Sequence, residues 1–316
     1  MTRFLPILAS FMLAFPLWAQ SYPDKPVRMV VPFPPGGPLD LVARVFATPM
    51  SEKLGQTFIV ENRAGATGNI GMEAVSRAQP DGYTLVWVID SMLTVNPTVF
   101  PAINEPLERL RPIGIVAENI STLAVNPSLG VKSVAEFIKV SNAKDLSYAS
   151  AGAGSPGHRY MELFKMITGA KATHVPYGGN AAGVQSLVAG ETQAFISPIA
   201  GVLQQVRAGK LLALAVSSAG RTASLPAVPT MAEAGYPKFT TVAWFGVYVP
   251  ARIPQAVFNV LESEMQRVTQ LPDVRERLIK AGSDAVWENQ KSVIARVGAE
   301  RKLWAEVIEK TGMKVE

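Results

Sequence analysis

The sequence predicts an α/β fold with parallel sheets, divided between two lobes that share several chain crossings. Short β-branched runs alternate with segments in which apolar residues recur at helical spacing, and this alternation is typical of α/β proteins. The chain has 316 residues, enough for two domains, of which 48% are hydrophobic and 17% charged. That composition excludes a disordered protein, which would lack the apolar surface to form a core.

The first part of the chain supports this fold element by element. Val27–Val31 is a β-branched run, and Leu39–Leu54 shows helical spacing before Gly55 stops it. We expect Pro49 to kink or shorten that helix. The next expected elements are a strand at Phe58–Val60, a helix at Met72–Ala78 and a continuous apolar strand at Tyr83–Ile89.

The same alternation continues to the end of the chain. Ser133 and Glu136 form a capping box that opens a helix, and Thr230 and Glu233 form another. Further strands are expected at Ile113–Ala117, Thr122–Val125, Leu146–Ala149, Thr173–Val175, Gln193–Ile196 and Leu211–Ser217, with Thr241–Val249 extended. Further helices are expected at Gly157–Thr168, Ala181–Ala189, Gly201–Ala208, Pro254–Gln270, Asp273–Ala281 and Gln290–Thr311.

The N-terminus has the pattern of a secretory signal peptide. Arg3 precedes an apolar stretch from Phe4 to Leu17, and Ala19 offers a small residue for cleavage. The stretch is shorter than a membrane span, although an uncleaved anchor is the alternative. We therefore expect residues 1–19 to be removed and the mature protein to be periplasmic. Because the sequence contains no cysteine, the N-terminus cannot be lipidated.

Composition excludes several classes of function. The absence of cysteine excludes disulfides, thiol nucleophiles and iron–sulfur clusters, and His158 and His174 are too few for a multi-histidine metal site. We expect no metal and no cofactor. The net charge of +5 is spread over the chain without a basic run, so nucleic acid is not an expected partner.

Polar and glycine-rich turns follow three of the expected strands and precede helices. They are Phe33–Asp40, Asp90-Ser91 and Ser150–His158. In open α/β sheets ligands bind beyond the carboxyl ends of the strands, where such loops gather. Amide groups at the start of a helix attract anions, and glycine lets the backbone approach the ligand closely. The alternative is that these are only tight turns.

The third loop imitates two catalytic motifs. Gly152, Gly154 and Gly157 spell the dinucleotide fingerprint, but the following strand ends near Tyr177 without the acidic residue that would bind a ribose. Ser155 stands in an elbow-like motif, so an exported serine hydrolase is an alternative function. Pro156 argues against it, because the residue after the nucleophile must donate an amide to the oxyanion.

A series of short motifs runs along the chain: Val31–Asp40, Val60–Gly65, Gly68–Gly71, Pro80–Leu85, Asn96-Pro97, Gly154–His158, Val175–Tyr177, Ala208–Leu211 and Leu225–Thr230. Together these motifs closely resemble the Bug-type substrate-binding proteins of tripartite tricarboxylate transporters. The resemblance covers nearly the whole mature chain.

This resemblance implies that the protein is a receptor and not an enzyme, with the type II periplasmic-binding-protein architecture. Its two lobes, residues 20–120 with 243–316 and residues 121–242, would close around a small organic carboxylate. The ligand would pass to the integral membrane permease subunits of the transporter, and the receptor would act as a monomer. A signalling receptor that presents its ligand to a sensor kinase is another alternative.

The resemblance also implies which residues bind the ligand. The first and third loops would hold one carboxylate, partly through ordered water, although Asp40 is expected to cap its own helix rather than touch an anion. More variable residues, on Asp90-Ser91, Tyr177–Asn180 and Ser197–Ala200, would contact the far end of the ligand. The expected ligand-binding residues are Phe33, Gly36, Gly37, Asp40, Asp90, Ser91, Gly154, Ser155, His158, Tyr177, Asn180 and Ser197.

Asp90 departs from the family pattern, in which an uncharged polar residue is usual. If its carboxylate faces the cleft, it repels a second carboxylate, and the far end of the ligand carries an amine, a hydroxyl or no charge. The alternative is that Asp90 caps a turn at the rim. Trp87, Trp244 and Phe245 could stack an aromatic ring or belong to the core.

Overall fold

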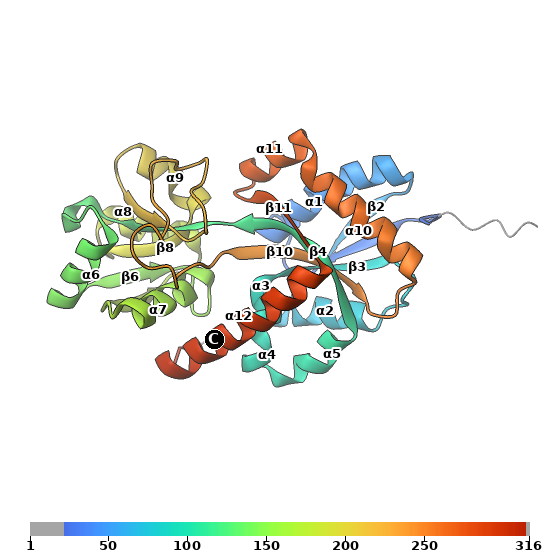
Figure 1. Cartoon of the computed structure of the whole chain (residues 1–316), viewed down its shortest axis with the longest axis horizontal. Helices are drawn as coiled ribbons and strands as arrows, with labels where there is room; N and C mark the ends of the chain where they lie inside the picture. Colours follow the sequence, from blue (N-terminus) through green and yellow to red (C-terminus); the bar gives the residue numbers. More distant parts are fainter. Residues whose placement is uncertain (1–21, 314–316) are drawn as a thin grey trace, which may run out of the picture.

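The computed structural model describes residues 22–313 and contains two mixed sheets with helices on both faces (Figure 1). The signal peptide expected at residues 1–19 lies outside the described residues. The larger sheet has the order β11-β4-β10-β3-β1-β2. Its strands are β1 (Val27–Val31), β2 (Phe58–Asn62), β3 (Thr84–Ile89), β4 (Leu110–Asn119), β10 (Ala243–Pro250) and β11 (Asp284–Asn289).

Helices cover this sheet on both faces. One face packs against the apolar sides of α1 (Pro38–Leu54), α10 (Gln255–Gln270) and α11 (Pro272–Lys280). The other face packs against α2 (Asn69–Ser76) and α3 (Asp90–Thr94), beside the short helices α4 (Asn96–Val99) and α5 (Asn104–Glu108). Pro49 does not shorten α1, which runs on to Leu54 and ends at Gly55 with φ +70°.

The smaller sheet has the order β7-β6-β8-β5-β9. Its strands are β5 (Ser121–Val125), β6 (Ser147–Ser150), β7 (Thr173–Pro176), β8 (Ala194–Pro198) and β9 (Leu212–Val216). Its helices are α6 (Val134–Ala143), α7 (Pro156–Thr168), α8 (Asn180–Ala189) and α9 (Ile199–Arg207). Single-turn 3₁₀ helices occupy Ala66–Gly68, Pro101–Ile103 and Pro127–Leu129.

The expectation of parallel sheets is only partly right. β1 pairs in parallel with β2 and β3, and β6 with β7 and β8. By contrast, β10 runs antiparallel to β3 and β4, and β5 runs antiparallel to β8 and β9. These antiparallel strands stand where the chain passes between the sheets, and a strand arriving from the other lobe need not follow a right-handed βαβ crossover.

The chain crosses between the sheets at two strands. A single residue, Ile120, separates β4 of the larger sheet from β5 of the smaller one. The return passes from β9 to β10 through a segment that includes the reciprocal Thr230–Glu233 box, which closes a turn rather than a helix. We propose the lobe boundaries near residues 120 and 242 on the basis of this sheet membership.

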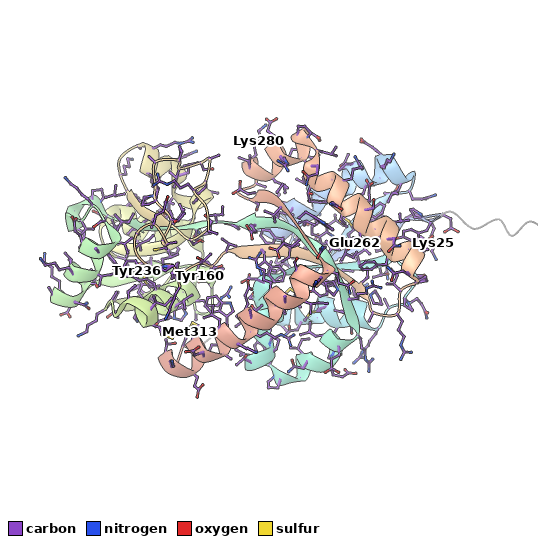
Figure 2. All side chains as sticks on the ribbon, in the orientation of Figure 1. Lys25, Tyr160, Tyr236, Glu262, Lys280 and Met313 are labelled. Carbon is purple, nitrogen blue, oxygen red and sulfur yellow. The ribbon has the colours of Figure 1, made fainter. Side chains whose placement is uncertain are left out.

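Helix α12 (Gln290–Thr311) extends from the larger lobe onto the smaller one (Figure 1). Its first part packs Val293 into the larger lobe, whereas Trp304 and Val307 lie in the core of the smaller lobe. Trp304 stacks on Tyr160 of α7 with ring centroids 5.8 Å apart. Figure 2 shows Tyr160 and Met313 in the region where the end of α12 meets the smaller lobe. No helix within residues 22–313 has both the length and the apolar character needed to cross a membrane.

Candidate functional site

A cavity of about 590 Å³ lies between the two lobes. The larger lobe contributes the loop before α1, the carboxyl ends of β3 and β4, and the start of β10. The smaller lobe contributes the starts of β5, α7 and α8 and the end of β8. The residues that line the cavity, from both lobes together, are Phe33, Pro34, Pro35, Gly36, Gly37, Pro38, Leu39, Ile89, Asp90, Asn119, Ser121, Ala151, Pro156, Gly157, Asn180, Phe195, Pro198, Ala243 and Phe245.

Long helices from both lobes begin at this cavity, and none of these starts carries a side-chain cap. Helix α1 begins after Gly37, α7 after Ser155, α8 after Gly179 and α9 after Pro198. The first amides of a helix have no acceptor within the helix, and the helix dipole makes this end electropositive. The cavity walls therefore offer amide donors to an anion without a basic side chain.

The loop before α1 is held in place by Asp40, which is buried. Its Oδ2 accepts hydrogen bonds from Gly36 N at 2.9 Å and from Arg44 Nε at 2.9 Å, and its Oδ1 accepts one from Asn62 Nδ2 at 2.8 Å. Although burial opposes this effect, these hydrogen bonds keep the pKa of Asp40 below its usual value. Asp40 does not line the cavity, and it holds the loop before α1 through Gly36 rather than capping its own helix as expected.

Asp90 lines the cavity and forms an ion pair with a residue that the sequence analysis did not identify. Arg159 Nη2 of α7 donates to Asp90 Oδ2 at 3.0 Å, and the two residues are 0% and 2% exposed respectively. Burial alone would lower the pKa of Arg159, but the Asp90 carboxylate more than offsets this and the guanidinium stays charged. Asp90 therefore faces the cavity with its charge paired, rather than capping a turn at the rim.

The third glycine-rich loop rests on a stacked pair of histidines. The rings of His158 and His174 lie 3.8 Å apart and nearly parallel, and the Tyr148 ring lies beside the pair, with its centroid 5.0 Å from that of His174 and 6.4 Å from that of His158. His158 Nδ1 accepts a hydrogen bond from Gly154 N at 3.0 Å, and His174 Nε2 lies 2.7 Å from Ser150 Oγ. Burial, with the neighbouring His174, lowers the pKa of His158 to about 4, so the ring is neutral at pH 7 and supports the loop as an acceptor.

The geometry of Ser155 does not support the serine hydrolase alternative. Ser155 Oγ is buried and has no hydrogen-bond partner among residues 22–313. The neighbouring His158 uses its Nδ1 to accept from Gly154, and His174 is paired with Ser150. Pro156 at the start of α7 has no amide to donate to an oxyanion. The nucleophile therefore lacks both an activating base and an oxyanion site in this structure.

The other expected site residues divide between the cavity wall and its surroundings. Phe33, Gly36, Gly37 and Asn180 line the cavity, as Asp90 does. Ser197 Oγ lies behind the wall and donates to Asn180 Oδ1 at 3.1 Å. The remaining ones lie on the same loops or on the elements that follow them, but outside the lining: Ser91, Gly154, Ser155, His158 and Tyr177.

Sequence reasoning missed several lining residues. Phe195 and Asn119 lie on strands that no glycine-rich turn follows, whereas Pro198 lies within the expected segment Ser197–Ala200. Of the three aromatic candidates, Phe245 lines the cavity, whereas Trp87 and Trp244 are fully buried in the core. One signal could have revealed Arg159, because it stands four residues before Leu163 on the apolar face of an expected helix, where a charge needs a buried partner.

Comparison with known proteins places this chain in a family of transport receptors. Residues 42–313 match the family described as "Tripartite tricarboxylate transporter family receptor". The protein BugT of Bordetella pertussis is 36% identical over 323 residues, which cover 100% of this chain and 99% of BugT. A UPF0065 protein of Pseudomonas sp. (strain P51) is 35% identical over 83% of this chain and 79% of its own length.

Solved structures agree with the sequence comparisons. A TctC solute-binding protein from Polaromonas, solved without ligand, has a TM-score of 0.83 at 26% identity and covers 92% of this chain and 99% of its own. An R. palustris protein solved with adipate has a TM-score of 0.76 at 32% identity, over 92% and 99% of the two chains. With the matching family model and these relatives, the chain belongs to the tripartite tricarboxylate transporter receptor family.

Proposed function

We propose that this protein is a periplasmic receptor that captures a small organic carboxylate between its lobes and delivers it to the membrane permease of a tripartite tricarboxylate-type transporter. It performs no catalysis and acts as a monomer. The observation that carries this proposal is the convergence of uncapped helix starts from both lobes on one cavity. An anion bound there is stabilised by both lobes at once, which favours the closed arrangement.

The relatives support the class of ligand. One R. palustris relative was solved with adipate, and MatC from the same species, 29% identical with a TM-score of 0.72 over 91% of this chain, was solved with bound malate. Both ligands are small carboxylates. The starts of α1 and α7, which face the cavity, provide backbone donors that suit a carboxylate whatever the rest of the molecule contains.

A thermal-shift screen tests the receptor proposal. The mature chain from residue 20, stripped of bound ligand, is titrated with aliphatic and aromatic carboxylates and with the primary amide of each acid as a matched control. A ligand at about 100 times its dissociation constant stabilises the folded state by roughly 2.7 kcal/mol, which raises Tm by several degrees. We expect one class of acid to give this shift and its amides to give none. A folded protein that responds to no carboxylate contradicts the proposal.

Uptake measurements test the permease partner. Cells that lack this receptor should lose uptake of the acid identified by the screen, and the full-length chain should restore it. Normal uptake without the receptor would contradict delivery to a permease. If such cells lose only a transcriptional response to the acid, the sensor-kinase alternative is favoured instead.

A further inference from the structure

We infer that the ligand is a monocarboxylate whose remaining body is uncharged and largely apolar, such as an aromatic or medium-chain aliphatic acid. This inference rests on the proposed receptor function and narrows its ligand. It depends on the charge balance of the cavity, the placement of its apolar side chains and its volume.

The charges at the cavity cancel, and the resulting neutral wall suits a ligand with a single carboxylate. Among the lining residues, all of them within residues 22–313, Asp90 is the one ionisable side chain, and Arg159 neutralises it from behind. Arg159 itself lies under the Trp304 ring, 4.8 Å from its centroid, and does not line the cavity. A second carboxylate on the ligand would find no cation on the wall, and burying an unpaired charge is unfavourable.

Apolar side chains make up most of the wall. Four of the lining side chains are polar, namely Asp90, Asn119, Ser121 and Asn180, and the others are apolar or glycine. Three phenylalanines come from different elements: Phe33 precedes α1, Phe195 lies on β8 and Phe245 on β10. Rings placed in this way provide contact surface for an apolar or aromatic ligand body.

The strand order fixes the direction in which the ligand lies. In the larger sheet, β1 leads to the amides at the start of α1, and β3, β10 and β4 follow side by side. Three strand spacings of ~4.8 Å separate β1 from β4, about 14 Å in all. Ile89 on β3 stands opposite Phe245 on β10 in the ladder. When the carboxylate of the ligand lies at the start of α1, the rest of the ligand therefore extends past Ile89 and Phe245 toward Asn119.

The cavity is large enough for such a body. Its volume of about 590 Å³ lies within the roughly 300–1,000 Å³ that is usual for small-molecule pockets. The relatives solved with adipate and malate hold ligands with two carboxylates. Because the described residues that line the cavity of the present chain include no cation for a second carboxylate, we expect its ligand to differ in class from theirs.

Two pairs of acids that differ by one carboxylate test the inference by calorimetry on the stripped mature protein: hexanoate against adipate, and benzoate against terephthalate. We expect the monoacid of at least one pair to bind roughly tenfold or more tightly than its diacid. A diacid that binds as tightly as its monoacid overturns the inference and leaves the receptor proposal standing. If none of the four acids binds, the inference fails, and the receptor proposal fails with it only if no other carboxylate of the thermal-shift screen stabilises the protein.

A variant gives the second readout. Asp90→Asn leaves Arg159 without its counter-charge, so the preference for the monoacid should shrink by several fold as the diacid gains a cation nearby. Asp81→Asn is the matched control, because Asp81 is partly exposed and precedes β3, at the end of the strand opposite to Asp90. An unchanged preference in Asp90→Asn would contradict the inference, and the wild-type comparison remains decisive if that variant does not fold.

Discussion

Asp90 and Arg159 form a buried ion pair that joins α3 of the larger lobe to α7 of the smaller lobe, across 69 residues of sequence. Arg159 Nε and Nη1 have no partner within residues 22–313, so Asp90 provides the anionic contact of this guanidinium. The pair thus connects three features: the ligand cavity, the contact between the lobes and the aromatic surface of α12. Its loss should affect stability as well as binding.

Replacing Arg159 by methionine should destabilise the protein by about 3–5 kcal/mol, because it leaves the Asp90 carboxylate buried without a partner. Urea unfolding followed by circular dichroism measures this. The double variant Arg159→Met with Asp90→Leu should recover much of the loss, since no charge is then left unpaired. Arg77→Met is the control, because Arg77 forms an exposed pair with Glu73 and should cost about 0–1 kcal/mol. Equal effects at the two arginines would contradict this account of the buried pair.

Acidification should destabilise the fold through the histidine pair. The pKa of His158 is about 4 in the folded protein, against a usual value of 6.5, so the unfolded chain takes up this proton first as the pH falls. The free energy of unfolding should therefore decrease from pH 6.5 to about 4 and be insensitive to this group above pH 6.5. The effect is about 1.4 kcal/mol for each unit of pKa difference.

Urea unfolding of the wild type and of His158→Gln across pH 5–7 tests this prediction, because most carboxyl groups are already ionised there. The variant should show a flatter dependence on pH. Ligand affinity of the wild type should stay constant over this interval and fall only as the pH approaches about 4, where a protonated Nδ1 can no longer accept the hydrogen bond from Gly154 N. Parallel stability curves for the two proteins would rule out His158 as the titrating group.

Gly201→Ala should weaken ligand binding while leaving the fold intact. A Cβ at Gly201 would overlap Asn180 Nδ2, and Asn180 lines the cavity. The Asn180 side chain must then turn away and lose its hydrogen bond with Ser197. Gly298→Ala in α12 is the matched control, because it meets no atom within 4 Å and should stabilise its helix by up to about 1 kcal/mol. Calorimetry should show weaker binding for the first variant and unchanged binding for the second.

Asn119 should select for a hydroxyl group at the far end of the ligand. Its Oδ1 is buried at the cavity and has no partner within the described residues, so a donor on the ligand would satisfy it. If benzoate binds, para-hydroxybenzoate should bind several fold more tightly, and Asn119→Leu should remove that advantage while retaining affinity for benzoate. An equal advantage in the variant would show that the hydroxyl lies elsewhere.

Local sequence signals predicted most of the elements. The helix expected at Leu39–Leu54 is α1, and the strand expected at Tyr83–Ile89 is β3, because both depend on spacing within one segment. Local spacing cannot reveal the antiparallel pairing of β10 with β3, which joins residues about 160 positions apart. β11 was missed because its residues are only half-buried and show no clear alternation.

The candidate site divides in the same way. Glycine-rich loops are local signals, so the sequence identified the turns before α1 and α7. The ion pair of Asp90 with Arg159 depends on the packing of α3 against α7, which no periodicity specifies. The hypothesis that Asp90 faces the cleft therefore did not include Arg159, the cation that neutralises its carboxylate. In the sequence, Phe195 likewise resembles an ordinary core residue, and only the packing of the two lobes places it at the cavity.

The path of α12 has a consequence for how the chain acquires its structure after synthesis. The smaller lobe takes its strands from the middle of the sequence, yet Trp304 and Val307 complete its core. Its hydrophobic core is incomplete until these two residues of α12 have packed onto it. The smaller lobe is therefore unable to mature as an independent cotranslational unit, and a chain truncated before Trp304 would expose Tyr160 and its apolar neighbours to solvent and to proteases.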